Sequence, residues 1–85
     1  MLDKPTDIAA TIRAVIAEKM DLKPEDLKDD ADLIKDIGFD SLDTVELIME
    51  VESALGIEIE ESAAASVKTV GDMITLATQI VEAKA

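Results

Sequence analysis

The sequence predicts an all-α fold, a four-helix bundle with three longer helices and one short helix. Apolar residues recur at helical spacing in three stretches, residues 7–20, 41–55 and 70–81, and a short alanine-rich stretch precedes the last of them. The 85 residues leave room for a single domain, of which we expect residues 6–82 to be structured. Hydrophobic residues make up 48% of the chain but include one Phe and no Trp or Tyr, so we expect an aliphatic core.

The first helix is expected over residues 7–20. Thr6 is a suitable N-cap, and Asp7 would lie in the first turn, where the helix dipole favours an acidic residue. The pattern breaks near Asp21. The predicted buried face comprises Ile8, Ile12, Val15, Ile16 and Met20.

Residues 21–38 form a long connection, which suggests short helices of its own or a function. Pro24 suits a first helical position, so a short turn should start there. The run 29–32 is polar and should be solvated, whereas Leu33, Ile34 and Ile37 should hold the connection to the core. The length of this connection suits a roughly parallel arrangement of the helix before it and the helix after it.

The second helix should run from Ser41 to Leu55, with Gly38 ending the preceding segment and Gly56 acting as a helix stop. It carries two apolar stripes, although one core needs only one. The stripe expected to be buried comprises Thr44, Leu47, Ile48, Val51 and Leu55. The second stripe, which we expect to face a partner, comprises Leu42, Val45 and Met49.

The remaining segments complete the bundle. Residues 56–60 alternate apolar and polar, but a lone strand is not stable, so we expect an extended loop that buries Ile57 and Ile59. A short third helix should occupy residues 61–65. Thr69 and Asp72 have the spacing of a capping box for the last helix. The apolar face of that helix comprises Val70, Met73, Ile74, Ala77 and Val81.

The net charge of −12 disfavours nucleic acid and anionic membranes as partners. Between Asp36 and Val67 there are nine acidic residues and no Lys or Arg, so basic protein surfaces or cations are the expected partners. The chain has no Cys or His, which excludes disulfides and thiolate zinc sites. It shows no apolar run of the roughly 20 residues that a membrane span needs and no secretory signal, and we expect a cytoplasmic monomer.

The acids of residues 29–43 do not form a calcium-binding loop of the EF-hand type. Aligning Gly38 with the glycine of such a loop places Leu33 and Ile37 at positions that require oxygen ligands. We therefore expect no specific metal site, only weak and nonspecific binding of divalent cations.

Ser41 is the candidate functional residue, but it is not expected to be catalytic. A serine nucleophile needs a neighbouring base, and the chain contains no His. The carboxylates of Asp40 and Asp43 are too acidic to serve as efficient bases for a hydroxyl. The simplest explanation of Ser41 is that it is the N-cap of the second helix, a position that serine favours.

The stretch Gly38-Phe39-Asp40-Ser41-Leu42-Asp43, followed by an acidic helix, resembles the attachment site of acyl carrier proteins, whose signature is Asp-Ser-Leu. The resemblance covers about residues 6–80 and implies the fold of that family. It implies that Ser41 carries 4′-phosphopantetheine, transferred from coenzyme A by a phosphopantetheinyl transferase. Acyl groups would be held on this arm as thioesters and delivered to fatty-acid, lipid or polyketide enzymes.

The same resemblance implies two further sites. Acyl-transferring and chain-extending enzymes with basic docking surfaces would recognise Asp40, Leu42, Asp43, Val45, Glu46, Met49, Glu50 and Glu52. An apolar seam beside the second helix would hold the acyl chain. Its candidate lining, from helix phase and resemblance, comprises Leu47, Ile48, Val51, Ile59, Ala64 and Val67.

Two positions depart from the family pattern. Phe39 stands where a small residue is common, so its ring is expected to contact the arm or a partner. Glu60 stands where many members have Pro. These departures leave open the hypothesis that the protein is a carrier specialised for one lipid or polyketide pathway. The alternatives are a peptidyl or aminoacyl carrier, although its usual Gly-Gly is absent, and a small acidic helical adaptor that is never modified.

Overall fold

The computed structural model describes residues 7–84. Four α-helices form, three long and one short, as the sequence predicts, and two shorter turns lie in the first connection. In chain order the elements are α1 (Asp7–Met20), the 3₁₀ turn η1 (Pro24–Asp26), the π-helical turn η2 (Leu33–Ile37), α2 (Ser41–Leu55), α3 (Glu61–Ala64) and α4 (Val70–Lys84). The predicted N-cap Thr6 lies outside the described residues.

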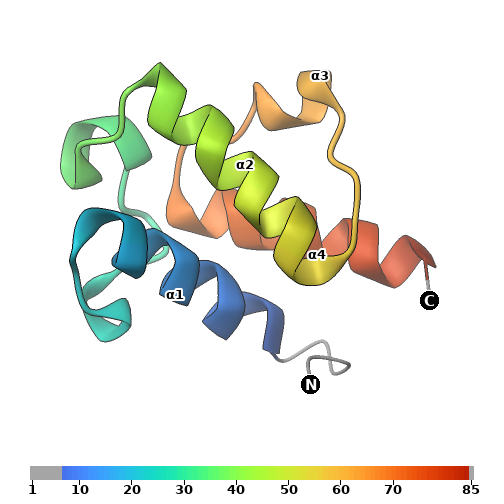
Figure 1. Cartoon of the computed structure of the whole chain (residues 1–85), viewed down its shortest axis with the longest axis horizontal. Coiled ribbons are helices and arrows are strands. Elements are labelled where there is room, and N and C mark those ends of the chain that lie inside the picture. Colours follow the sequence, from blue (N-terminus) through green and yellow to red (C-terminus); the bar gives the residue numbers. More distant parts are fainter. Residues whose placement is uncertain (1–6, 85) are drawn as a thin grey trace.

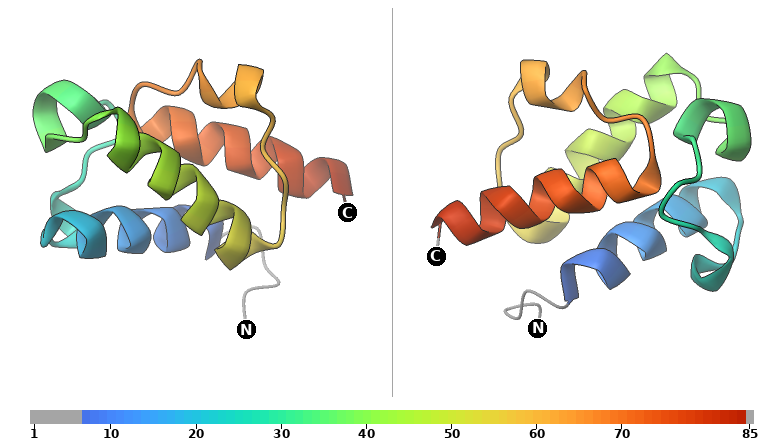
Figure 2. Two further views of the ribbon diagram at one scale, coloured as in Figure 1. Left: turned by 45° about the horizontal axis from the view of Figure 1, so that its top comes forward. Right: turned by 180° about the vertical axis from the view of Figure 1, so that it is seen from behind.

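The three long helices pack together, and α3 lies on the side of α2 and α4 that is away from α1 (Figures 1 and 2). Helix α1 runs in the direction opposite to α2 and α4. The expectation that the first two helices are parallel is therefore wrong. The connection between them does not travel back along the bundle; it folds up at one end of it as η1 and η2.

Backbone hydrogen bonds join this first connection to the segment before α4 and to the first turn of α4. The N–H of Leu33 donates to the carbonyl of Lys68 at 2.9 Å, and the N–H of Gly71 donates to the carbonyl of Asp29 at 2.7 Å. Arg13 of α1 forms an ion pair with Asp29 on the same connection. The connection therefore belongs to the folded body of the protein and fixes the position in which α2 starts.

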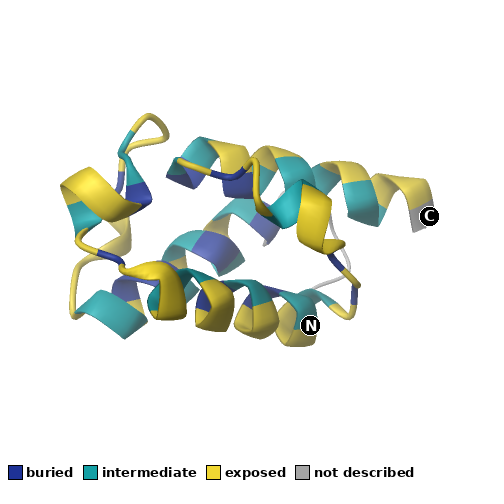
Figure 3. Cartoon of the chain, turned by 90° about the horizontal axis from the view of Figure 1, so that it is seen from above, coloured by how far each residue is buried: buried dark blue, intermediate teal, exposed yellow. Residues whose placement is uncertain are grey.

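The buried positions of the helices face one another in the interior (Figure 3). The fully buried large side chains are aliphatic, as predicted: Ile12, Ile16, Leu33, Leu47, Val51, Val70 and Met73. Ile57 and Ile59 are also buried, which confirms the extended loop before α3. Thr69 and Asp72 form the predicted capping box of α4, with each backbone N–H donating to the other's side chain at 3.0–3.1 Å.

Two residues of the first connection lie differently from the prediction. Phe39 is only 2% exposed, because the turn at Gly38 directs its ring into the core, so the expected contact with the arm or a partner is wrong. Ile34 is 59% exposed and does not hold the connection to the core. It lies one residue after Leu33, which takes the buried position of η2.

Candidate functional site

The start of α2 is built by Asp40 and Asp43, with Ser41 between them. Asp40 is the N-cap: its Oδ1 accepts a hydrogen bond from the N–H of Asp43 at 2.8 Å. In return, Asp43 Oδ2 accepts from the N–H of Asp40 at 3.1 Å, which completes a capping box. The interpretation of Ser41 as the N-cap is therefore wrong. Asp40 takes that role, and Ser41 is the first residue of the helix.

The Ser41 side chain is exposed. Within the part of the chain that the structure describes, its hydroxyl makes no hydrogen bond. The N–H groups of Ser41 and Leu42, in the first turn, have no acceptor inside the helix. An anion attached to this hydroxyl would therefore sit at the positive end of the helix dipole. The exposed hydroxyl is accessible for attachment of a group, and the helix dipole favours an anion there, whereas the carboxylates of Asp40 and Asp43 oppose one.

The second apolar stripe of α2 lies in solvent, as the sequence predicts. Leu42, Val45 and Met49 are 63%, 54% and 60% exposed. A row of this kind on an otherwise polar helix face is typical of a surface that contacts another protein.

The acids beside this stripe have partners inside the protein. Lys19 of α1 lies between Glu46 and Glu50, and its ammonium donates to Glu46 Oε1 at 2.6 Å. The hydrogen bond that Lys19 donates to Glu46 and the charges of both carboxylates raise the pKa of Lys19. Glu52 accepts a hydrogen bond from the N–H of Ile59 at 2.7 Å, so it fastens the loop that leads to α3.

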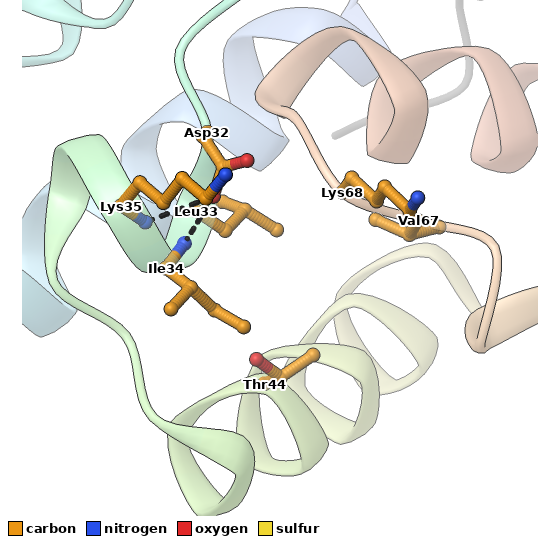
Figure 4. A pocket seen from close by; sticks show the side chains of 7 residues that line it. All are labelled: Asp32, Leu33, Ile34, Lys35, Thr44, Val67 and Lys68. Carbon is orange, nitrogen blue, oxygen red and sulfur yellow. Dashed lines mark hydrogen bonds between the residues drawn. The ribbon is translucent and has the colours of Figure 1, made fainter.

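Two hollows open beside α2, and Thr44 lines both of them. The first, a crevice of about 300 Å³, lies between η2, the start of α2 and the segment before α4. Figure 4 shows Ile34 and Thr44 approaching from two elements on one side, with Val67 and Lys68 across from them. The second, a groove of about 450 Å³, lies between α2 and α3. Thr44 is three residues from Ser41, so the two lie on neighbouring positions of the helix surface.

The candidate lining residues of the acyl seam divide between these hollows and the core. Ile48, Ile59 and Ala64 line the groove, and Val67 lines the crevice. Leu47 and Val51 are fully buried and line neither of the two. Residues that we did not single out from the sequence for this seam also line the hollows: Thr44, Val45, Met49, Leu33 and Ile34. Thr44 lies one helical turn from Ser41, and this spacing could have identified Thr44 from the sequence as a lining residue.

The described residues contain no group of three or more acidic side chains arranged to hold a metal ion. None of the helices in residues 7–84 has the length and apolar character needed to cross a membrane. The carboxylates at the start of α2 are instead used in hydrogen bonds within the protein.

Comparison with known proteins identifies the family. Residues 10–77 match the family model described as a phosphopantetheine attachment site. Acyl carrier proteins from two strains of Caulobacter vibrioides are each 40% identical to the chain over 74 residues, which cover 87% of this chain and 95% of theirs. The chain belongs to the acyl carrier protein family. Its structure also resembles that of the acyl carrier protein from Enterococcus faecalis, with a TM-score of 0.78 at 21% identity, covering 91% of this chain and 98% of that one.

Membership of this family establishes the role of the protein as a carrier of acyl groups. It also establishes the prosthetic group, a covalently attached 4′-phosphopantetheine. As an acyl carrier protein, the chain interacts with a phosphopantetheinyl transferase and with biosynthetic enzymes. The fold and this role confirm the predictions made from the sequence.

Proposed function

We propose that Ser41 is the residue that carries the arm. Three observations support this position: the Asp-Ser-Leu motif lies inside the matched region, the hydroxyl is exposed, and the first turn of α2 can stabilise an anion. The bound arm supplies a thiol on which an acyl group is held as a thioester. Asp40 and Asp43 hold the helix start rigid around the attachment point.

The protein itself has no catalytic residue in this proposal. The chain lacks His, and both carboxylates beside Ser41 accept backbone hydrogen bonds as caps. Activation of the hydroxyl is then the task of the transferase, and every later bond-making step belongs to a partner enzyme. We propose that the chain forms one acyl carrier domain that works as a monomer in the cytoplasm.

The surface that docks with these enzymes would be the exposed stripe of Leu42, Val45 and Met49 and the acids along it. Exposed apolar side chains flanked by half-exposed carboxylates suit a partner with an apolar centre and a basic rim. The acidic contributors we propose are Asp40, Asp43, Glu46, Glu50 and Glu52. The net charge of −12 would make such contacts fast and sensitive to salt.

The groove between α2 and α3 is our proposed acyl site. Ile48, Ile59 and Ala64 provide apolar walls, and Thr44 connects the groove with the crevice near Ser41. Burial of the chain there would remove methylene groups from water and protect the thioester. Leu47 and Val51 lie beneath this wall and would be reached only if the helices part.

The intact mass of the protein from its native host tests this proposal. A mass increase equal to phosphopantetheine, or to the arm with an acyl group, is expected. Release of the cargo by hydroxylamine would identify its link to the arm as a thioester. The mass of the released acyl group would then indicate the pathway, whether fatty-acid, lipid or polyketide. An aminoacyl cargo would instead support a peptidyl carrier, and an unmodified chain would contradict the proposed attachment.

A further inference from the structure

Lys19 is a cation placed on the acidic side of α2 by a different helix. Its ammonium lies 2.6 Å from Glu46 Oε1 and 3.5 Å from Glu50 Oε2. The Lys19 side chain is only 14% exposed, whereas those of Glu46 and Glu50 are 47% and 49% exposed. The lysine is therefore largely covered, while about half of each glutamate remains open to an approaching molecule.

The position of Lys19 is favourable for two independent reasons. Glu46 and Glu50 are four residues apart on one helix, where like charges repel, and a cation between them relieves that repulsion. Lys19 also lies in the last turn of α1, where the helix dipole favours a positive charge. Both effects keep the ammonium on the glutamates when no other protein is present.

We propose that Lys19 limits the strength of docking, because it neutralises Glu46 and Glu50 from inside the protein and competes with the basic side chains of a partner enzyme. This inference rests on the proposed role of the α2 face. A partner's Lys or Arg then meets carboxylates that already have a cation within hydrogen-bonding distance. The attraction is weakened, and the carrier leaves each enzyme more readily.

Replacing Lys19 with Met keeps an unbranched apolar stem and removes the charge. With a phosphopantetheinyl transferase, coenzyme A and Mg²⁺, we expect Lys19→Met in the full-length apo chain to lower KM about two- to fivefold at low salt, with kcat unchanged. The decrease should vanish in high salt, since exposed charges are screened. Lys19→Arg, which retains the cation, should have the KM of the unmodified sequence.

Lys23→Met is the matched control. Lys23 is exposed and, within the described part of the chain, belongs to no ion pair, yet its removal changes the net charge equally. A second test is independent of any stability change: in a Glu46→Gln/Glu50→Gln background, Lys19→Met should alter KM no more than Lys23→Met does. Melting curves confirm that each variant is folded; if Lys19→Met is not, Lys19→Gln takes its place.

Two results would overturn the inference and leave the proposed function intact. One is an equal KM change in Lys19→Met and Lys23→Met, which would mean that only net charge matters. The other is a higher KM in Lys19→Met, which would mean that Lys19 assists docking. Failure of the transferase to modify the unaltered chain at all would instead overturn the proposed function, and this inference with it.

Discussion

Asp40 and Asp43 cap each other across the first turn of α2. Asp40 Oδ1 accepts from the N–H of Asp43 at 2.8 Å, and Asp43 Oδ2 accepts from the N–H of Asp40 at 3.1 Å. These carboxylates lie on both sides of Ser41 in the sequence, and in the structure they cap the helix. They define where the helix begins and leave the serine as its first residue, outside the capping hydrogen bonds.

The first prediction separates the capping role of Asp40 from its charge. Asp40→Ala should reduce the free energy of unfolding by about 0.5–2 kcal/mol, the usual loss for an N-cap. Asp40→Asn keeps an oxygen acceptor without the charge, so it should cost less. Urea unfolding of the two variants measures this difference. Unaltered stability in the alanine variant would show that the capping box contributes nothing.

The second prediction concerns Phe39. Because its ring is buried, Phe39→Ala should lower the free energy of unfolding by about 3–5 kcal/mol, a large part of the stability of a protein this small. Leu42→Ala, three residues away on the exposed stripe, is the control and should change it by less than about 0.5 kcal/mol. Chemical unfolding monitored by circular dichroism compares them. Similar small effects would mean that the ring does not support the core.

The burial of Phe39 could not be predicted from the sequence, because periodicity is informative only inside a regular helix. Helix α2 was predictable with its bounds: glycines lie on both sides of it, and its two apolar stripes have helical spacing. Phe39 lies in the turn before that helix. Its direction depends on Gly38, whose φ is +99°, and on the packing of η2.

The N-cap of α2 and its ion pairs with Lys19 could not be predicted from the sequence for other reasons. Asp40 and Ser41 are both favoured N-cap residues, so the sequence cannot decide between them, and only the backbone geometry does. Lys19 reaches Glu46 over 27 positions of sequence, a contact that depends on α1 and α2 running in opposite directions. Since the length of the connection suggested parallel helices, this contact could not be anticipated.

The third prediction concerns the pH dependence of the α4 cap. Hydrogen bonds from the N–H groups of Lys68 and Thr69 lower the pKa of Asp72. A lowered pKa in the folded state means that the stabilisation is complete above the ordinary Asp value of about 4 and is lost as the pH falls through the lower value. Asp72→Asn should therefore melt below the unaltered protein at pH 6, and the difference should shrink below about pH 4.

Asp30→Asn is the control for this pH dependence. Asp30 is exposed, so its replacement removes the same charge without removing a cap. Given the net charge of −12, this variant should melt no lower than the unaltered protein at pH 6. A difference between Asp72→Asn and the unaltered protein that stays constant from pH 6 to pH 3 would contradict the assigned role of the ionised carboxylate.

The fourth prediction concerns the cargo. Acyl groups of increasing length should raise the melting temperature above that of the unacylated, modified protein until the groove is full. Each buried methylene contributes at most about 0.8 kcal/mol, less the cost of parting the helices. Ala64→Phe should abolish the increase by filling the groove, whereas Ala10→Phe, at an exposed position of α1, should not. A melting temperature independent of acyl length would indicate that the cargo stays in solvent.

The central claim, that Ser41 carries the arm, is tested most directly by intact-mass spectrometry after incubation with a phosphopantetheinyl transferase, coenzyme A and Mg²⁺. We expect one added phosphopantetheine on the unaltered chain and on Ser53→Ala, which replaces another exposed serine of the same helix. Ser41→Ala should gain no mass. An equal gain in Ser41→Ala would contradict the account and place the arm elsewhere.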